Sequence, residues 1–430
     1  MKQLVKGLSR LINMAKNHGG YFVTTFINSS LPLLFLPVLT RYLEPAEYAN
    51  IALFNFYLAL SNSLSGTSVP VVISKNFFEK PKEYIAKIIG NSIRIVFMFS
   101  SITTILILIF YKQIESFLDL PLLWLLLIPW GSFFFILFNM ALTVHRNEKK
   151  VLVFSYHKIG NTFVNILISL FLIVVLLWGW QGRVVGILAS YFISAIWALY
   201  YLKKQHYLKL SFNKDLTKDI LKVILPLVPN SFQYIIISHV GLFFMQLYFA
   251  KDVVGVYSVS YQISFSISLL YTTLSFSWNP YVYEQLSRKG KINAIEFTRY
   301  FYLLSAVVFS GVVFLYLFSG FILKVLTTNE YMGATVFIPL LSLGFFFKGM
   351  YVLLLPILMK HEMQKNVSLI SLVNMFLMLG LNIVFIKLYG PIGVTYAFCA
   401  TCFLLFLPVI ILVQKVNPLP WLKALTFLKK

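Results

Sequence analysis

The chain has 430 residues, of which 59% are hydrophobic and only 12% are charged, and its mean hydropathy is +0.82. Soluble globular domains carry about 25% charged residues and are at most about half apolar, so this composition excludes a soluble globular protein. Two cysteines are too few for a disulfide-stapled domain, and the long apolar runs exclude a disordered chain. What remains is a membrane protein that crosses the bilayer many times.

Apolar runs long enough to cross a bilayer recur along the whole chain. A membrane-spanning helix needs about 20 mostly apolar residues, whereas barrel strands would give weaker alternating segments of about ten. The runs therefore predict twelve helices, at residues 20–40, 48–70, 90–111, 121–143, 160–180, 184–202, 224–249, 254–276, 300–323, 333–358, 366–387 and 391–413.

Lysine and arginine are distributed unequally between the two sides of the predicted spans. The tracts on the side of the N-terminus hold 28 of the 36 basic residues and the opposite tracts hold 6, while Arg94 and Lys348 fall inside spans. Basic residues accumulate on the cytoplasmic side of membrane proteins, so both termini are expected in the cytoplasm. The net charge of +22 is thus explained by topology, and nucleic acid is not an expected partner.

The chain is expected to divide into two lobes of six helices around a central cavity. Residues 1–18 place apolar side chains at helical spacing opposite basic ones, which predicts an amphipathic helix on the cytoplasmic face. The other predicted parts are an N-terminal lobe at 19–202, a cytoplasmic linker at 203–223, a C-terminal lobe at 224–413 and a basic cytoplasmic tail at 414–430.

The two predicted lobes resemble each other in sequence. TRYLEPAEYANIAL at residues 40–53 aligns with QLYFAKDVVGVYSV at 246–259, and Asn165 aligns with Asn374, at offsets of 206 and 209. Because each half has six spans, both halves start on the cytoplasmic side and have the same orientation. A substrate is therefore expected to bind between the halves, near the centre of the membrane.

Prolines occur at matching places in the two halves. The first span carries Pro32 and Pro37, and the seventh carries Pro226 and Pro229. Proline removes a backbone donor and kinks a helix, so the first helix of each half is expected to bend and to act as a hinge. The alternative is that these prolines are simply tolerated in membrane helices.

The ionisable side chains inside the predicted spans are basic. None of the fourteen acidic residues lies centrally in a span, although coupled exporters of cationic drugs normally need an intramembrane carboxylate. Lys348 lies about 15 Å from the cytoplasmic end of its span, too deep for easy snorkelling, and is expected to face a wet cavity or a partner. Arg94, His239 and Arg41 are further candidates for binding an anionic substrate. The alternatives are a structural lysine, a snorkelling Arg94, a satisfied core histidine and an interface charge at Arg41.

Uncharged polar side chains gather in the first two helices of each half. Amides and hydroxyls suit sugar hydroxyl groups, and tyrosine rings can stack on sugar rings. Each of these residues alone is as well explained by hydrogen bonding between helices, but together they are candidates for the cavity wall. They are Asn28, Asn55, Asn62, Asn230, Gln233, Tyr257, Tyr261 and Gln262.

Three segments together resemble bacterial polysaccharide and O-antigen flippases of the Wzx type. They are LPLLFLPVLTRYLEPAEYANIAL at 31–53, VVGVYSVSYQI at 253–263 and NIVFIKLYGPIGVTYA at 382–397, and the similarity extends over essentially the whole chain. That family belongs to the multidrug/oligosaccharidyl-lipid/polysaccharide exporter superfamily. The chain departs from the family at 240–243, where Val-Gly-Leu-Phe stands in place of a frequent Asp–Arg pair.

The resemblance implies an all-α transporter of the bacterial inner membrane that works by alternating access. Its substrate would be a polyprenyl-pyrophosphate-linked oligosaccharide, an O-antigen or capsule repeat unit, moved from the cytoplasmic to the outer leaflet. Expected partners are this lipid-linked glycan, membrane lipids, a polysaccharide polymerase and a chain-length regulator. No enzyme activity, cofactor or metal site is expected. A pyrophosphate needs cations in a low-dielectric cavity, and the membrane potential can drive its outward movement by about 2.3 kcal/mol per charge per 100 mV.

Two other function classes stay open. A drug or cation antiporter of the same superfamily would share the fold but would need an intramembrane carboxylate. A membrane-embedded polysaccharide polymerase or glycosyltransferase has a comparable number of spans, but it would need a substantial outward loop or an acidic metal-binding pair in one, and the outward tracts of this chain are short.

Overall fold

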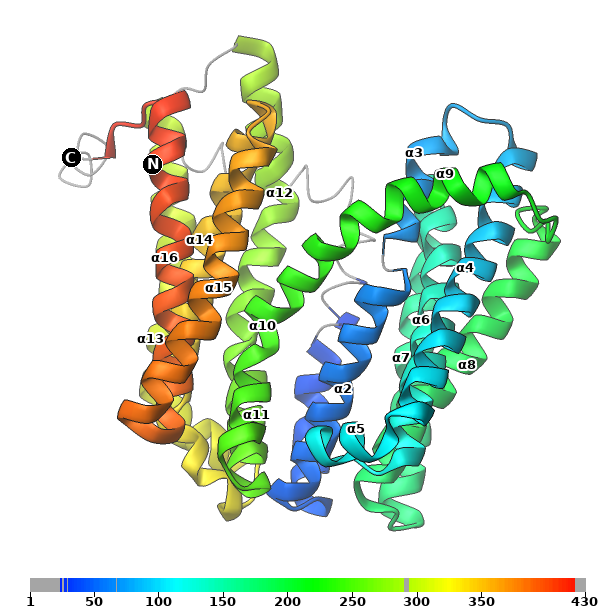
Figure 1. Cartoon of the computed structure of the whole chain (residues 1–430). Coiled ribbons are helices and arrows are strands. Elements are labelled where there is room, and N and C mark those ends of the chain that lie inside the picture. The colour runs from blue at the N-terminus through cyan, green and yellow to red at the C-terminus, as the bar shows by residue number, and fades with distance from the viewer. Residues whose placement is uncertain (1–23, 25–26, 29, 67, 290–293, 422–430) are drawn as a thin grey trace. The chain divides into compact units, whose positions relative to one another are not determined.

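The computed structural model describes residues 24, 27–28, 30–66, 68–289 and 294–421 (Figure 1). Within these residues the regular structure is helical throughout, so the predicted all-α fold is confirmed. Eight helical stretches are long and apolar enough to cross a membrane, or up to ten if each of two bent helix pairs forms one span. One stretch, Gln364–Val416, contains two helices joined by a short turn. The number of twelve spans and the cytoplasmic termini stay predictions, and the predicted helix at 1–18 lies outside the described residues.

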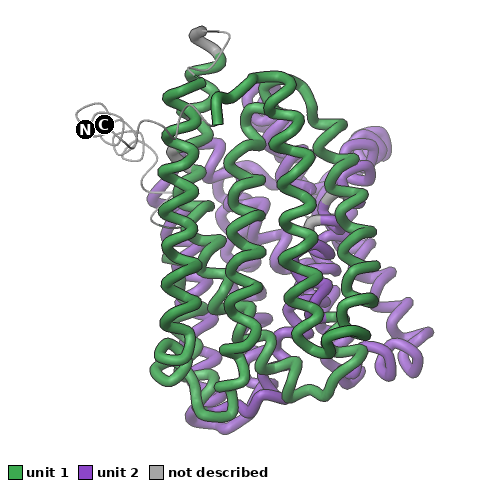
Figure 2. Tube along the Cα trace, turned by 90° about the vertical axis from the view of Figure 1, so that its left-hand side faces the viewer, with its two compact units in different colours: residues 1–41, 243–430 green, residues 42–242 purple. Residues whose placement is uncertain are grey.

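The chain divides into two compact units (Figure 2). Unit 1 comprises residues 1–41 and 243–430, and unit 2 comprises residues 42–242. These divisions differ from the predicted ones, because the first helix (30–42) groups with the second half of the sequence and the other division falls inside a helix. Thr40 shows how the first helix is held in unit 1: its hydroxyl donates to the carbonyl oxygen of Leu326 at 3.0 Å, and its own carbonyl accepts from Thr328.

Unit 2 is a bundle in which α4, α6, α7 and α8 run side by side (Figure 1). Its elements are α2 (Pro45–Ser65), α3 (Val69–Phe77), α4 (Lys82–Ile109), α5 (Tyr111–Leu118), α6 (Leu122–Asn147), α7 (Val151–Leu170), a π-helical turn (Phe171–Val175), α8 (Gly179–Lys204), α9 (Lys214–Ile224), a 3-10 turn (Leu225–Leu227) and the first part of α10 (Val228–Tyr248).

Unit 1 contains the end of α10 and the remaining long helices. They are α11 (Lys251–Ser264), α12 (Ser266–Lys289), α13 (Ala294–Leu326), a 3-10 segment (Asn329–Val336), α14 (Ile338–Lys360), α15 (Gln364–Tyr389), a 3-10 turn (Gly390–Ile392) and α16 (Gly393–Val416). Pro391 and the left-handed Gly390, with φ of 63°, reverse the chain between α15 and α16. This turn lets α16 pack against both α14 and α15.

The turn before α8 lies earlier in the chain than predicted. Hydropathy placed it at 181–183, but the π-helical turn ends at Val175 and α8 begins at Gly179. Leu177 and Gly179 both have left-handed backbone angles, with φ of 52° and 57°, and they reverse the chain in three residues. Arg183, which the prediction placed in the outward loop, therefore lies in the second turn of α8.

The seventh predicted span is bent in the structure. The helical segments Lys214–Gln233 and Ile235–Tyr248 meet at an angle of 48°, in a stretch that also holds Pro226 and Pro229. Leu225–Leu227 forms a 3-10 turn, which accommodates the missing amide of Pro226. The hinge role of these prolines, and of Pro32 and Pro37 in the first helix, stays a prediction.

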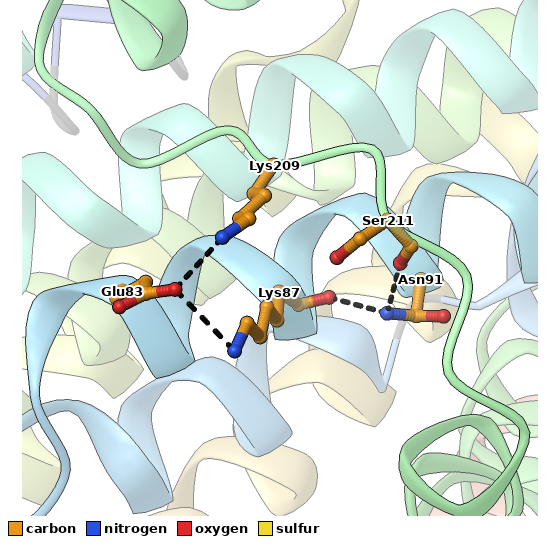
Figure 3. Close-up of polar contacts among 5 residues, drawn as sticks. All are labelled: Glu83, Lys87, Asn91, Lys209 and Ser211. Carbon is orange, nitrogen blue, oxygen red and sulfur yellow. Dashed lines mark hydrogen bonds and ion pairs between the residues drawn. The ribbon is translucent and has the colours of Figure 1, made fainter.

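The linker after α8, residues 205–213, is attached to α4, and we call this attachment the strap. The amide of Lys209 donates to the carbonyl oxygen of Ala86, and the side chain of Asn91 donates to the carbonyl of Ser211 at 3.1 Å (Figure 3). Glu83 forms ion pairs with Lys209 at 2.8 Å and with Lys87 at 3.4 Å. Because exposed ion pairs contribute little stability, the backbone and amide contacts must carry most of the attachment.

Helix α9 extends this attachment. Asn213 caps its first turn by accepting from the amide of Leu216 at 2.9 Å. The buried side chains of Leu216, Ile220 and Ile224 recur at helical spacing and belong to the apolar core that α3, α4 and α6 also form. The linker and α9 are thus parts of unit 2, and the chain leaves the unit only within α10.

Gly90 gives a test of the strap. A Cβ at this position would lie 2.0 Å from the carbonyl oxygen of Lys209, whereas a Cβ at Gly160, in the same unit, would meet nothing within 4 Å. We expect Gly90→Ala to push the linker off α4, lower the melting temperature by several degrees and speed proteolysis at 205–213. Gly160→Ala should leave both unchanged or raise the melting temperature, since alanine favours a helix by about 1 kcal/mol over glycine. Equal behaviour of the two variants would contradict the strap.

Candidate functional site

Lys348 lies in the middle of α14 and is buried, with 7% of its surface exposed. It follows the start of the helix by ten residues and precedes its end by twelve, so either end is about 15–18 Å away. Its ammonium group is an electrostatic neighbour of the buried thiol of Cys402 on α16. A lysine at this depth cannot easily carry its charge to the membrane surface, and its role in a cavity or with a partner stays a prediction.

The helices around Lys348 pack closely because two glycines flank it. A Cβ at Gly344 would lie 2.6 Å from the ring of Phe398 on α16, and a Cβ at Gly349 would lie 2.6 Å from the ring of Tyr271 on α12. These glycines let α16 approach α14 before the lysine and let α12 approach it directly after the lysine. Lys348 therefore lies where three helices pack closely.

Two of the predicted tyrosines stand in an aromatic cluster of unit 1. The ring centroids of Tyr257 and Tyr261 are 6.3 Å apart, and Tyr261 contacts Phe345 at 5.3 Å and Phe398 at 6.2 Å. Tyr257 is buried against Phe337 at 5.8 Å. Both tyrosines lie on α11, and Tyr261 packs against Phe345 of α14 and Phe398 of α16, the helices that carry Lys348 and its neighbour Cys402. Their place in a cavity wall stays a prediction.

The remaining candidates of unit 1 belong to the first helix or bind it. The side-chain amide of Gln262 donates to the carbonyl oxygen of Pro32 at 2.7 Å, which ties α11 to the first helix. Asn28 is half-buried, Pro37 is half-buried and Arg41 is exposed at the helix end. The hydrogen bond of Gln262 therefore joins α11 to the first helix.

Arg94, a candidate in unit 2, binds the linker. Its guanidinium donates to the carbonyl oxygen of Leu210 and lies 5.6 Å from the ring of Phe212. The side chain is exposed and contributes to the strap on α4. The structure therefore gives Arg94 a contact with the linker that the sequence did not suggest.

The other polar candidates of unit 2 have differing environments. Asn55 on α2 is exposed, Asn62 is half-buried, Gln233 on α10 is 5% exposed, and His239 is half-buried. The side chain of Asn230 lies outside the described residues. The role of these residues in binding stays a prediction.

Sequence reasoning missed a polar network that joins α7 and α8. Arg183 donates through Nη1 to the side-chain oxygen of Asn165 and to the hydroxyl of Ser169 at 2.8 Å. Asn165 in turn donates to Ser190 at 3.3 Å, and the phenols of Tyr48 and Tyr191 are electrostatic neighbours of the guanidinium. The repeat alignment had already marked Asn165, but Arg183 was assigned to a loop because the turn was placed too late.

The position of Arg183 is electrostatically unfavourable when no anion is bound to it. It lies in the second turn of α8, and taking a guanidinium out of water into a helix pair costs free energy. Glu47 partly compensates, because its carboxylate accepts from the amide of Trp180 at 3.3 Å. The carboxylate approaches so closely that a Cβ at Gly179 would lie 2.2 Å from its Oε1. An anion would be stabilised by both the guanidinium and the helix end.

The second half of the chain builds the same helix pair without an arginine. Asn374 on α15 aligns with Asn165, but Gly390–Ile392 stands where Arg183 would be. Asn374 is 2% exposed, and neither polar atom of its side chain has a hydrogen-bond partner in the described structure. Since α15 and α16 pack together without such a residue, packing of the helix pair does not require Arg183.

Metal ligands are not clustered in the part of the chain that the structure describes. No group of three or more His, Cys, Asp or Glu side chains there is placed to hold a metal ion. Cys399 and Cys402 are free thiols on one face of α16.

The comparisons with known proteins decide the family. The sequence profile described as "Polysaccharide biosynthesis protein" matches residues 14–285, more than half of the chain. The chain belongs to this family. A curated relative of this chain is described as an uncharacterized membrane protein of Haemophilus influenzae. It is 19% identical over 380 residues, which cover 86% of this chain and 89% of the relative.

Solved structures of transporters have the same fold as this polysaccharide biosynthesis protein. An inward-facing multidrug resistance MATE family transporter of the MOP superfamily has a TM-score of 0.68 at 16% identity, covering 90% of this chain and 95% of its own. A MATE transporter of Vibrio cholerae has a TM-score of 0.58 at 11% identity, covering 97% and 98%. The protein is thus a multi-pass protein of the bacterial inner membrane with the two-lobed fold of MOP-superfamily exporters.

Replacing Lys348 and replacing Arg183 should have different effects on the stability of the protein. Replacing a buried charged group by an apolar one of similar size is often neutral or stabilising. We therefore expect Lys348→Met to keep or raise the melting temperature of the purified protein. Arg183→Met leaves Asn165 and Ser169 without their donor, which should cost about 1–3 kcal/mol and lower the melting temperature. A marked loss of stability in Lys348→Met would instead make the lysine structural.

Proposed function

We propose that this polysaccharide biosynthesis protein is a flippase that moves a polyprenyl-pyrophosphate-linked oligosaccharide from the cytoplasmic to the outer leaflet by alternating access. The observation that carries the proposal is a buried lysine in the middle of α14, in a chain of this family with no central intramembrane carboxylate. A central cation without a central anion suits an anionic cargo. A neutral glycan alone would give no reason to bury the charge.

Charge balance supports an anionic substrate. A charged side chain inside the hydrocarbon region costs several kcal/mol, and such residues usually mark a substrate or ion pathway. Lys348 in unit 1 is the group that we assign to the pyrophosphate, and Arg183 in unit 2 is a separate candidate for an anionic group. Tyr261, which is half-buried in the aromatic cluster, is our candidate for contact with a sugar through its ring and hydroxyl group, whereas Tyr257 is buried against Phe337 and supports it.

The direction of transport follows from the charge of the cargo. Moving a negative charge from the negative interior outward releases about 2.3 kcal/mol per charge per 100 mV. A pyrophosphate diester carries about two negative charges, so the membrane potential could drive the step without a coupling carboxylate. Transport in proteoliposomes that is unchanged when the potential is collapsed would contradict this part of the proposal.

The similarity to MATE structures favours one other function, the export of cationic drugs. Such a substrate would be repelled by Lys348 and Arg183, and it would need a carboxylate that the predicted spans do not hold centrally. A polymerase or glycosyltransferase is less well supported, because the family and the fold are those of transporters.

Complementation tests the flippase against these alternatives. In a deletion strain of the host, surface glycan should be lost while lipid-linked repeat units accumulate in the inner leaflet. A plasmid with Lys348→Arg should restore the surface glycan because the charge is kept. With Lys348→Ala the amount of surface glycan should be lower by a factor of ten or more, which corresponds to a loss of about 1.4 kcal/mol or more in the free energy of substrate binding. Lys324→Ala, which removes an exposed lysine at the end of α13, is the matched control. Full restoration by Lys348→Ala would contradict the proposal.

A further inference from the structure

A tight turn between α6 and α7 brings two histidines together in unit 2. The turn closes within three residues: Lys149 has a left-handed φ of 59°, and the amide of Lys150 donates to the carbonyl oxygen of His145 at 2.9 Å. His145 lies two residues before the end of α6 and His157 lies six residues after the start of α7. The two side chains nevertheless meet, with Nε2 of His145 and Nδ1 of His157 only 2.8 Å apart.

The histidine pair is enclosed by aromatic rings of α8. His145 is 0% and His157 is 4% exposed. The ring of His145 lies edge-on to Tyr201 with centroids 4.2 Å apart, and His157 packs edge-on against Trp197. Three helices therefore meet at the pair, at the basic end of the bundle, which the charge distribution assigns to the cytoplasm.

Counting protons shows that the pair can accept one more. Two neutral imidazoles carry two N–H groups, of which one is used in the shared hydrogen bond. The outer nitrogens, Nδ1 of His145 and Nε2 of His157, are buried and have no hydrogen-bond partner. In the neutral pair one of them is a donor and the other an acceptor. An added proton makes both of them donors, and these donors then need an anionic or neutral acceptor.

The nearest anionic group in this region is Glu148, which is already engaged by the linker. It is one turn beyond His145 and accepts from Tyr201 at 3.3 Å and from Tyr207 of the linker at 3.1 Å, and it forms an ion pair with Lys150 at 3.0 Å. The hydrogen bond to Glu148 raises the pKa of Lys150, so this lysine stays charged. Burial, together with the nearby carboxylate, raises the pKa of the Tyr207 phenol, so Tyr207 stays a donor.

Every helix packed at the pair contributes charged or titratable groups. Burial disfavours an imidazolium at both histidines, while Glu148 attracts one at His145 and Lys150 repels it. The exposed Arg146 on α6 and the half-buried Lys158 on α7 add further positive charge at this end, and Lys82 on α4 lies 4.4 Å from the ring of Tyr207. The surroundings are thus positive except for one carboxylate, which makes Glu148 the group that an added proton must recruit.

We propose that the His145–His157 pair is a proton-binding site, and that its protonation draws Glu148 away from Tyr207 and releases the root of the linker. The ligand is a proton taken up from the cytoplasmic side. In the neutral state Glu148 holds α6, α7, α8 and the linker together. In the protonated state the imidazolium competes with the linker phenol for the same carboxylate. Proton binding and the docking of the linker therefore oppose each other.

Trp197 provides a reporter for the test, because an imidazolium against an indole ring quenches its fluorescence. The full chain in lipid nanodiscs is titrated from about pH 8 to about pH 3, below the usual range of histidine because burial disfavours an imidazolium, and the emission of Trp197→Phe is subtracted at each pH. We expect an acid transition in this difference signal. Over the same transition, amide hydrogen exchange of the linker residues 205–213 should become about tenfold faster.

Variants separate the proton site from other histidines. His145→Gln and His157→Gln should each abolish the transition, whereas His206→Gln, which removes an exposed histidine of the linker, should leave it unchanged. Glu148→Gln keeps the pair, so quenching should persist while linker exchange is fast at every pH. The proposal is overturned if the Trp197 signal shows no acid transition, if the transition survives in the histidine variants, or if linker exchange in the wild type does not follow it.

Discussion

The structure depends on one constraint: a polar group inside the hydrocarbon region must find its partner within the protein. The chain meets it by forming helices, which satisfy their own backbone, and by keeping its acidic residues out of the centres of the predicted spans. Neutral amides and hydroxyls join neighbouring helices, as Asn161 does when it donates to Ser194 at 2.9 Å. Lys348 and Arg183 differ from these neutral groups, because placing their charges inside the hydrocarbon region costs free energy. We explain this cost by an anionic substrate that binds during transport.

The internal duplication makes these exceptions informative. Corresponding helix pairs fold around Asn165 in one half and Asn374 in the other, yet only the first pair carries an arginine. Arg183 is half-buried in unit 2, and Gly390–Ile392 stands at the matching place in the second half of the chain. Residues that break a structural repeat in this way are better candidates for function than residues that both halves share.

The sequence predicted the all-helical fold correctly, because helices follow from the lengths of apolar runs, and it drew attention to Lys348 because this residue interrupts such a run. The role of Lys348 in binding stays a prediction. The sequence could not predict the turn at Leu177 and Gly179, since hydropathy does not detect left-handed backbone angles, and Arg183 was therefore assigned to a loop. It also could not predict that Arg94 binds Leu210, or that His145 and His157 meet, because both contacts join segments whose register is set by packing and turn geometry. A short stretch of sequence is enough to predict that a helix forms. The partners of polar side chains depend instead on how distant segments pack.

The most direct test of the central claim is a leaflet-accessibility assay in proteoliposomes. A polyprenyl-pyrophosphate-linked oligosaccharide is placed in both leaflets, and the fraction that an added impermeant glycosidase can cleave is followed over time. We expect wild-type protein to raise this fraction from about half toward completion, since flipping renews the accessible pool, and Lys348→Met to leave it near half. If the fraction stays at half with wild-type protein while the same vesicles accumulate a cationic dye, the protein is a drug exporter and not a flippase for an anionic lipid-linked glycan.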